Sequence, residues 1–519
     1  MITRIKAHLP VLLAIFFIII ASVLFLWSTE QGIGIRGDST IYLSTAVNLL
    51  NGNGFVFNGE PMTAYAPLYP AVLAFTGLFN PDLLAAARWL HLILYVVNLL
   101  LFAGIFYTLT NRNLLAGGLA SIIFITSKTV IYVHTITWSE PLFIMLMFSA
   151  CLLLARYFVT QKWKFLLFGS ILCGLAVLTR YAGLALIPAV ALGILILSAQ
   201  PLRKRFVALM AFCSIAILPM AVWAIRNMLI TQNGQQAARA LIFHPRSITT
   251  LGRELTSLFY MFIFPGEGSK YWMAAVIVLL TLCLFVLLGI LWKNRRFYLD
   301  SHRYETSILG LTVLMLVSFL VTVFGSITFV DAAIPITERI FIPAMLLIII
   351  SAFSAIFMLS WLKKGEWLYW ASIVLMVLFF HFNIADTRAF TKIIHREGIG
   401  FNSIPWKNSE TISSMTELDA GQVIYSNSAD ILIALTGRPV IVPFPLKYTP
   451  RYGLENSHYQ QEMMDMCDNV KNGDAIIVYM TDIERAYFTG YEELVNTCQF
   501  PSRVEFSDGV IFGNITADS

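Results

Sequence analysis

The sequence predicts a polytopic α-helical membrane protein with a small α/β domain at its C-terminal end. Of its 519 residues, 58% are hydrophobic and only 13% are charged, whereas soluble proteins carry about 25% charged residues. Long apolar runs recur up to residue 383, and most are close to the ~20 residues that a membrane-spanning helix needs. After residue 384 short β-like runs alternate with polar helical segments, a pattern typical of a small α/β domain.

We expect about eleven spans from these apolar runs. The first lacks a cleavage site followed by a soluble domain, so we expect it to be retained rather than removed as a signal peptide. The spans are expected at residues 8–28, 84–109, 114–132, 139–158, 164–179, 181–198, 206–225, 271–292, 305–325, 340–360 and 366–383.

Basic residues between the spans predict the orientation. Clusters of Lys and Arg fall on alternate connections, and such clusters mark the cytoplasmic side. We therefore expect a cytoplasmic N-terminus and, with an odd number of spans, an exoplasmic C-terminal region in the cell membrane. The clusters are Arg4 with Lys6, Arg112, Arg156 with Lys162 and Lys164, Arg203 to Arg205, Lys293 with Arg295, Arg296 and Arg303, and Lys363 with Lys364.

The expected domains are a membrane domain, 1–383, with outer loops 29–83 and 226–270, and an exoplasmic α/β domain, 384–519. The second loop mixes apolar and basic residues and could form amphipathic helices on the membrane surface. In the α/β domain, Cys467 and Cys498 could pair if they face an oxidising compartment. Its strands are expected at 422–426, 440–442, 475–479 and 504–512, and its helices at 431–435 and 457–471.

Asp38 is the first candidate functional residue. It follows the first span and precedes a predicted surface helix, 43–54, with apolar residues at helical spacing. A carboxylate beside the membrane suits a general base that acts on a membrane-borne substrate. The simpler interpretation is a helix N-cap, a position that Asp favours.

Further polar residues fall at outer span ends. Glu140 precedes Pro141 at the start of a span, where it could orient Asp38, a metal or a substrate hydroxyl, or simply complement the helix dipole. Arg180 and Tyr181 join two short spans. Guanidinium groups bind phosphate in bidentate fashion, so clustered arginines suit a lipid phosphate, although any single one could be structural. The arginines are Arg180, Arg226 and Arg339, with Arg36 as a further candidate.

Short motifs along residues 1–360 occur in the order seen in certain GT-C glycosyltransferases. The chain resembles the branch that contains protein O-mannosyltransferases, lipid A aminoarabinose transferases and related bacterial enzymes of the PMT_2 type. It departs from the protein mannosyltransferases, which carry an Asp-Glu pair where this sequence has Gly37-Asp38-Ser39. The motifs are Gly37-Asp38-x-x-x-Tyr42, Asn51-Gly52-Asn53-Gly54-Phe55, Pro67-Leu68-Tyr69-Pro70, Trp138-Ser139-Glu140-Pro141, Thr179-Arg180-Tyr181-Ala182-Gly183, Arg226-Asn227 and Glu338-Arg339.

The resemblance implies a GT-C-like fold and roles for individual residues. Asp38 corresponds to the catalytic base and Glu140 to a second acid of the next outer loop. The positions expected to bind substrate are Tyr42, Tyr69, Arg180, Tyr181, Arg226 and Arg339.

The residues and the resemblance together predict an inverting transfer of a sugar from a polyprenyl-phosphate donor to an acceptor hydroxyl on the outer membrane face. The acceptor is a glycan, a lipid or a protein; no nucleic acid is expected. No cofactor is implied, and a requirement for Mg²⁺ or Mn²⁺ is left open. The alternatives are a transporter or flippase of lipid-linked sugars and a receptor role for the α/β domain. The absence of an internal repeat disfavours the transporter. The receptor role is disfavoured because the number of spans is far more than an anchor for the α/β domain needs.

Overall fold

The computed structural model describes residues 2–230, 243, 252–256, 258, 289–290, 293–331, 334–362, 365–415, 418–419, 421–438, 440–449, 454–500 and 502–513. The span expected at 271–292 and the amphipathic helices expected at 226–270 fall almost wholly outside these residues. Both therefore stay predictions.

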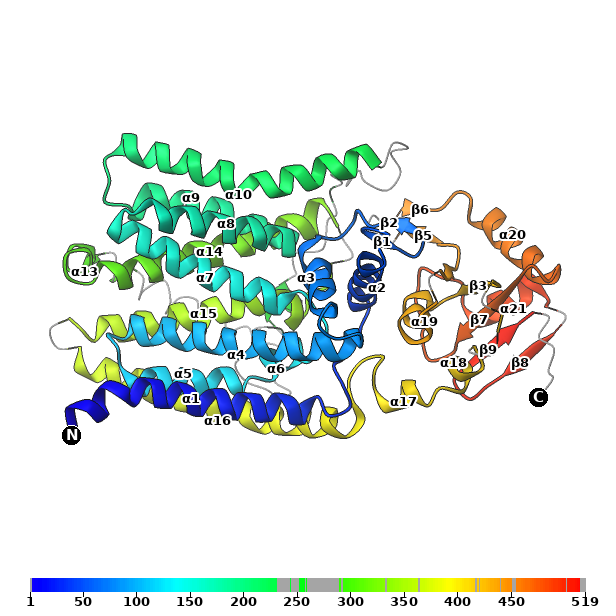
Figure 1. Ribbon diagram of the computed structural model, residues 1–519, viewed down its shortest axis with the longest axis horizontal. Coiled ribbons are helices and arrows are strands. Elements are labelled where there is room, and N and C mark those ends of the chain that lie inside the picture. Colours follow the sequence, from blue (N-terminus) through cyan, green and yellow to red (C-terminus); the bar gives the residue numbers. More distant parts are fainter. Residues whose placement is uncertain are drawn as a thin grey trace.

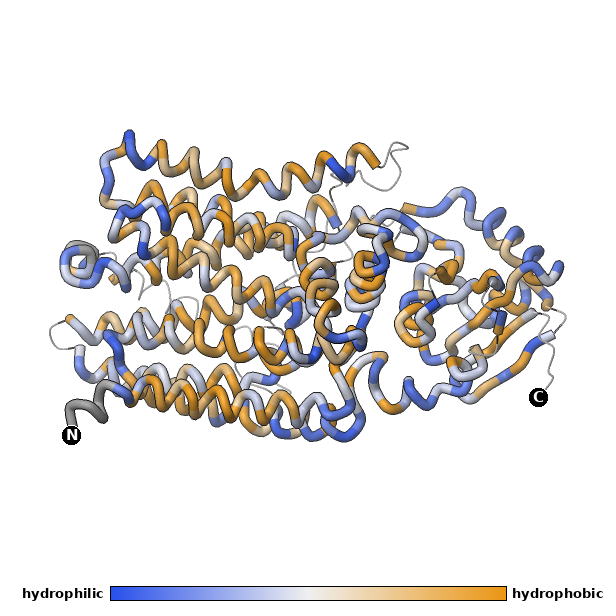
Figure 2. The backbone as a smooth tube through the Cα atoms, viewed as in Figure 1, coloured by the Kyte–Doolittle hydropathy of each residue, from blue (hydrophilic) through white to orange (hydrophobic). Residues whose placement is uncertain are grey.

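A bundle of long helices lies at one end of the molecule and a small mixed domain at the other (Figure 1). The long helices are apolar over most of their length, whereas hydrophilic residues collect at the bundle's ends and over the small domain (Figure 2). The main bundle helices are α1 (Ile2–Ser28), α4 (Leu83–Leu109), α5 (Leu114–Ile125), α6 (Lys128–His134), α7 (Glu140–Thr160), α8 (Trp163–Thr179), α9 (Leu186–Leu197), α10 (Leu202–Ile230), α14 (Arg303–Phe329), α15 (Glu338–Leu359) and α16 (Glu366–Glu397).

Seven helices of the described part are long and apolar enough to cross a membrane, and an eighth span results if α5 and α6 count as one. These two helices meet at an angle of 61°, where Ser127 Oγ accepts a hydrogen bond from Val130 N at 3.4 Å and so starts α6. A multi-pass helical membrane protein is confirmed. The count of eleven, which includes the shorter α8 and the η1–α9 segment, stays a prediction.

Short elements connect one end of the bundle to the small domain (Figure 1). The expected surface helix is present as α2 and starts earlier than predicted, at Asp38 itself. These elements, together with the short helices outside the bundle, are α2 (Asp38–Leu50), β1 (Val56–Phe57), β2 (Glu60–Pro61), α3 (Leu68–Gly77), η1 (Tyr181–Ala185), α13 (Arg295–Ser301) and α17 (Ile404–Lys407).

The small domain contains a five-stranded sheet in the order β4-β3-β7-β9-β8. Strand β3 runs parallel to β4 and β7, while β9 runs antiparallel to β7 and β8. The elements are α18 (Glu410–Ser414), β3 (Val423–Ser426), α19 (Ala429–Thr436), β4 (Val442–Pro443), β5 (Tyr448–Thr449), β6 (Leu454–Glu455), α20 (Tyr459–Lys471), β7 (Ala475–Met480), α21 (Tyr491–Cys498), β8 (Arg503–Glu505) and β9 (Gly509–Phe512).

Central strand β7 is buried on both faces. Side chains alternate along a strand, so Ile477 and Tyr479 enter one core with α20 and α21, while Ile476 and Val478 enter a second core with α18 and α19. The expected α/β domain is thus confirmed, but the strand expected at 504–512 is wrong: the segment turns back on itself to form the antiparallel strands β8 and β9.

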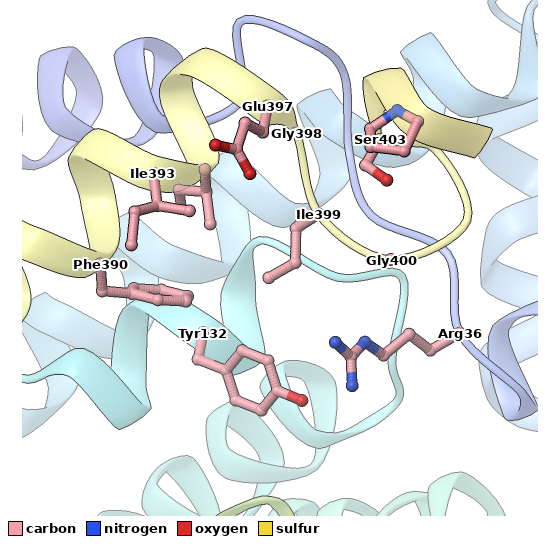
Figure 3. A pocket seen from close by; sticks show the side chains of 11 residues that line it. Arg36, Tyr132, Phe390, Ile393, Glu397, Gly398, Ile399, Gly400 and Ser403 are labelled. Carbon is pink, nitrogen blue, oxygen red and sulfur yellow. The ribbon is translucent and has the colours of Figure 1, made fainter. Parts of the chain in front are cut away.

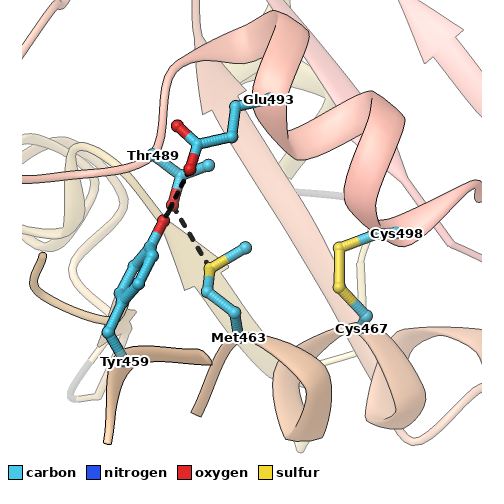
Figure 4. The surroundings of a disulfide bond; sticks show 6 residues. All are labelled: Tyr459, Met463, Cys467, Thr489, Glu493 and Cys498. Carbon is cyan, nitrogen blue, oxygen red and sulfur yellow. Dashed lines mark hydrogen bonds between the residues drawn. A yellow bond between two sulfur atoms is a disulfide. The ribbon is translucent and has the colours of Figure 1, made fainter. Parts of the chain in front are cut away.

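A disulfide joins α20 to α21 on the first of these faces. Cys467 and Cys498 are bonded, with their Cα atoms 5.1 Å apart, as Figure 4 shows. Beside them, the Tyr459 hydroxyl lies 2.7 Å from Thr489 Oγ1 and donates to Glu493 Oε1 at 3.2 Å. The pairing left open by the sequence is therefore present and fixes the two helices together.

The hairpin of β1 and β2 joins the first outer loop to the small domain. Asn58 Nδ2 donates to the carbonyl oxygen of Ile441 at 3.0 Å, and Ile441 N donates back to Asn58 Oδ1 at 2.9 Å. Phe57 packs against the core that α18 and α19 share. One asparagine side chain thus mimics a neighbouring strand at the β4 edge of the sheet.

Candidate active site

Four charged side chains from distant parts of the chain meet at the end of the bundle that carries α2 and α3. Asp38 is the first residue of α2, and Glu140 is the first residue of α7. Arg180 lies at the turn between α8 and η1, and Arg339 is in the first turn of α15. We call these four residues the acid–arginine cluster.

Arg339 holds both carboxylates of the cluster. Its Nη2 donates to Asp38 Oδ2 at 2.5 Å and its Nε donates to Glu140 Oε1 at 2.5 Å. The guanidinium also lies 4.1 Å from the ring centroid of Trp138, close enough for a cation–π interaction. The planar guanidinium is therefore fixed by contacts in its plane and on its face.

Glu140 is the buried centre of the cluster, with a side chain only 1% exposed. Its Oε1 also forms an ion pair with Arg180 Nη1, which donates to Ser139 Oγ at 3.2 Å as well. Its Oε2 has no hydrogen-bond partner among the described residues. Burying a carboxylate is costly unless it is paired, and the two arginines supply that pairing for Glu140.

Asp38 remains accessible, with 30% of its side chain exposed. Gly37 occupies the N-cap position of α2, and Asp38 makes no capping bond there. Gly37 adopts a φ of 20°, which suits glycine. The interpretation of Asp38 as a helix cap is therefore wrong: its side chain faces Arg339 and Tyr65 instead.

Three tyrosines form an aromatic wall beside Asp38. Tyr65 donates its hydroxyl to Asp38 Oδ1 at 3.1 Å, and the Tyr42 ring meets Tyr65 and Tyr69 edge to face. Burial and the nearby Asp38 carboxylate raise the pKa of Tyr65, so it stays protonated and can donate. The same two causes raise the pKa of Tyr42, whose hydroxyl oxygen is 3.4 Å from Ser139 Oγ.

Tyr65 and Trp138 are cluster neighbours that sequence reasoning did not select. Trp138 lies inside a motif singled out from the sequence, two positions before Glu140, and Tyr65 lies two positions before another motif, which begins at Pro67. Their aromatic type alone does not distinguish them from core residues. Only the fold shows that they contact Asp38 and Arg339.

Tyr181 and Arg226 lie apart from the cluster contacts, on a separate set of bonds. Arg226 Nη1 donates to the carbonyl oxygen of Met62 at 2.9 Å, and its guanidinium lies 4.5 Å from the Trp223 ring centroid. Trp223 Nε1 donates to the Tyr181 hydroxyl at 3.3 Å. Arg226 therefore attaches the end of α10 to the loop that carries Tyr65.

A buried network behind the tyrosines fixes the start of α7. The hydroxyl of Tyr69 lies 2.6 Å from His91 Nε2, and His91 Nδ1 lies 2.9 Å from the carbonyl oxygen of His134. Asn98 Nδ2 lies 3.1 Å from His134 Nε2 and donates to the carbonyl oxygen of Pro141 at 2.8 Å. Because Nδ1 of His91 faces only a carbonyl, it carries the proton, and Nε2 accepts from Tyr69.

Charges balance within the acid–arginine cluster, since two carboxylates face two guanidinium groups. Across the residues that the structure describes, no three His, Cys, Asp or Glu side chains gather in a way that could hold a metal ion. What the site offers chemically is a partly exposed carboxylate with fixed donors on both oxygens, next to a buried ion-paired acid.

The helix bundle and the small α/β domain define the class of protein: a multi-pass helical membrane protein with a C-terminal α/β domain. A family model described as dolichyl-phosphate-mannose-protein mannosyltransferase (PMT_2) matches residues 64–223. The expected GT-C resemblance is thereby confirmed. A comparison with curated proteins gives no match.

Solved structures carry the same architecture over nearly the whole chain. ArnT from Cupriavidus metallidurans bound to undecaprenyl phosphate is 12% identical, with a TM-score of 0.55, and the match covers 97% of this chain and 98% of that one. Its apo state gives a TM-score of 0.57 at 12% identity, covering 96% and 97%. The arabinofuranosyltransferase AftD from Mycobacteria is 13% identical, with a TM-score of 0.53, covering 96% of this chain and 39% of that one.

Proposed function

We propose that this chain is a glycosyltransferase that moves a sugar from a polyprenyl-phosphate donor to an acceptor hydroxyl at the outer face of the membrane. The observation that carries this proposal is the Asp38 carboxylate, which is partly exposed beside a buried, ion-paired acid at one end of the bundle. The PMT_2 match and the fold shared with ArnT and AftD support the enzyme class.

Asp38 acts as the general base. Its oxygens accept from Arg339 and Tyr65, which stabilises the anionic form yet leaves lone pairs for an acceptor hydroxyl. The acceptor oxygen attacks the anomeric carbon, and its proton passes to Asp38 as the bond from the sugar to the phosphate oxygen breaks. A single displacement of this kind inverts the anomeric configuration.

Glu140 acts as a positioning residue. It accepts from Arg339 and pairs with Arg180, so the guanidinium that orients Asp38 is itself held from the buried side. Tyr42 and Tyr69 are buried and pack edge to face beside Asp38, so they support the space next to the carboxylate from behind.

Arg226 is the strongest candidate for the donor phosphate. Within the described residues its hydrogen bonds go to neutral oxygens, and no carboxylate pairs with it. Arg180 and Arg339 are already paired with acids, so a phosphate is attracted more strongly by Arg226. Tyr181 lies near Arg226 because its hydroxyl accepts a hydrogen bond from Trp223. The leaving group becomes a phosphate monoester with an added negative charge, which charge-assisted hydrogen bonds stabilise. In the similar ArnT structure the bound lipid is undecaprenyl phosphate.

Orientation follows from the basic clusters. With the N-terminus in the cytoplasm, the acid–arginine cluster and the domain 384–519 face the exoplasmic side of the cell membrane, where a glycan, lipid or protein acceptor is reached. The placement of the small domain beside α2 and α3 supports a role near the acceptor (Figure 1).

A transfer assay separates this function from a flippase. The protein is reconstituted in vesicles with polyprenyl-phosphate sugars, labelled in the sugar, and a membrane extract as the acceptor source. We expect the label to leave the lipid and free polyprenyl phosphate to accumulate. Movement of the intact donor across the bilayer without cleavage would instead establish the transporter.

A further inference from the structure

A pocket of about 260 Å³ lies at the C-terminal end of α16 (Figure 3). Its walls come from α6, from the last turns of α16, from the turn that follows and from the segment before α2. Its lining includes Arg36, Tyr132, Phe390, Ile393, Glu397 and Ile399.

The pocket lies at the depth of lipid headgroups. Helix α16 has 32 residues, about 48 Å at 1.5 Å per residue, whereas the hydrocarbon layer takes only about 20 residues. No Asp, Glu, Lys or Arg occurs between Glu366 and Asp386, so this stretch fills the hydrocarbon layer. The pocket residues from Phe390 to Glu397 therefore lie just beyond it.

A glycine turn shapes one side of the pocket. Gly400 pairs with Ile35 in an isolated bridge, and it adopts a φ of 67°. A Cβ at this position would lie 2.1 Å from the carbonyl oxygen of Ile35. This close approach, which only glycine permits, brings Arg36 against the turn and closes the pocket on that side.

Charges of both signs face the pocket from separate walls. The Arg36 guanidinium lies 5.8 Å from the Tyr132 ring centroid, and no carboxylate pairs with it among the described residues. A second cation, Lys128 Nζ, lies 6.0 Å from the Phe390 ring centroid. Figure 3 places the Glu397 carboxylate on the opposite side of Ile399 from Arg36.

These features select the chemistry of a ligand. Arg36 suits a phosphate, and Glu397 suits an ammonium group a few bonds away from it. Between them lie aromatic and aliphatic side chains, and Ile393 is 53% exposed on the outside of α16, where an acyl chain could follow the helix. A bare anion would leave Glu397 unmatched, and a plain hydrocarbon would leave both charges unmatched.

We propose that this pocket binds the headgroup of a phospholipid that carries a primary amine next to its phosphate, as in phosphatidylethanolamine. The phosphate contacts Arg36, the ammonium group contacts Glu397 and one acyl chain lies along α16. The site is separate from the donor site and does not depend on the proposed reaction. Tyr132 packs edge to face on Trp138 at 5.2 Å, and Trp138 in turn packs under Arg339, so a bound lipid stabilises this wall of the cluster.

Lipid binding to the purified full-length protein tests the proposal directly. The protein in detergent is titrated with phosphatidylethanolamine, phosphatidylglycerol, phosphatidylcholine or inorganic phosphate. Bound lipid is counted by native mass spectrometry, and the melting temperature is followed in parallel. We expect phosphatidylethanolamine to bind about 10-fold more tightly than phosphatidylglycerol, since the charge-assisted contact of the ammonium group with Glu397 is replaced by a weaker contact of a neutral glycerol hydroxyl. Phosphatidylcholine, which lacks amine N–H donors, should lie between the two.

Two variants and a control make the result specific. Arg36→Ala should weaken both phosphatidylethanolamine and phosphatidylglycerol, while Glu397→Gln should abolish the preference between them. Arg388→Ala removes an exposed charge of the same helix that does not line the pocket and should change neither. Equal binding of all three lipids, or an unchanged preference in both pocket variants, would overturn the proposal. Saturation by inorganic phosphate alone would assign the pocket to free phosphate and also overturn it.

Discussion

Arg339 Nη2 lies 2.5 Å from Asp38 Oδ2, although the two residues are 301 positions apart in the sequence. Their contact joins the start of α15 to the start of α2. It orients the Asp38 carboxylate, and the buried Glu140 fixes the other side of the same guanidinium. The predictions below follow from this arrangement and its surroundings.

Asp38→Asn should reduce sugar transfer at least about 100-fold, because general bases contribute roughly 10²–10⁴-fold. Donor binding should persist, since the amide oxygen can still accept from Arg339. Initial transfer rates and donor binding are measured side by side. Asp82→Asn is the matched control, because Asp82 caps α4 and Asn caps equally well. Activity of the Asp38 variant within a few-fold of the unmodified protein would remove Asp38 from the role of base.

Arg339→Lys should lower the maximal rate about 10-fold or more. A lysine keeps the charge but presents one ammonium group, which cannot make the planar contacts to both carboxylates. The melting temperature and the rate are compared with those of Arg112→Lys, a change at the opposite end of the bundle. Full activity of Arg339→Lys would show that the positive charge alone, and not the two directed hydrogen bonds of the guanidinium, positions Asp38.

Arg226→Ala should weaken donor binding about 10-fold, because charge-assisted phosphate contacts are among the stronger hydrogen bonds. The effect should exceed that of Glu140→Gln on the same donor affinity, since Glu140 repels a phosphate. Binding is measured with a polyprenyl phosphate that lacks the sugar. An unchanged affinity would leave Arg226 as a structural tie between α10 and the loop at Met62.

Asn58→Ala should loosen the small domain from the first outer loop. The change removes both hydrogen bonds with Ile441, each contributing about 1 kcal/mol. We expect faster hydrogen exchange in the β1–β2 hairpin and in β4, measured by mass spectrometry. Asn53→Ala, which removes an exposed bond to Asn48, should leave exchange in β4 unchanged. Equal protection of β4 in the Asn58 variant would show that the Phe57 contact alone holds the hairpin.

Topology and the disulfide are checked independently of the reaction. A reporter fused after Ser519 should be active on the exoplasmic side, and a cytoplasmic signal would reverse the proposed orientation.

In denatured protein, two of the six cysteines should react with a thiol reagent only after reduction. Reaction of all six before reduction would show that Cys467 and Cys498 are free in the cell.

The sequence by itself determined the local features. Apolar runs of membrane length predict the long helices, because a helix forms the backbone hydrogen bonds within the segment itself, as the interior of a bilayer requires. Short β-like runs that alternate with polar helical segments, together with turn residues, likewise predict the bounds of β3, β7 and α20 to within a residue or two. Asp38, Glu140, Arg180 and Arg339 were selected as charges at outer span ends, and all four meet in the structure.

Only the tertiary structure decided which of these charges touch. Helix packing places Arg339 between Asp38 and Glu140, while Arg226 binds backbone carbonyls of another loop instead. The contacts of Tyr65, Trp138 and Asn58 depend on how remote segments pack. A local sequence pattern fixes the face and the depth of a side chain, but a contact between distant residues is fixed by the packing of the elements that carry them.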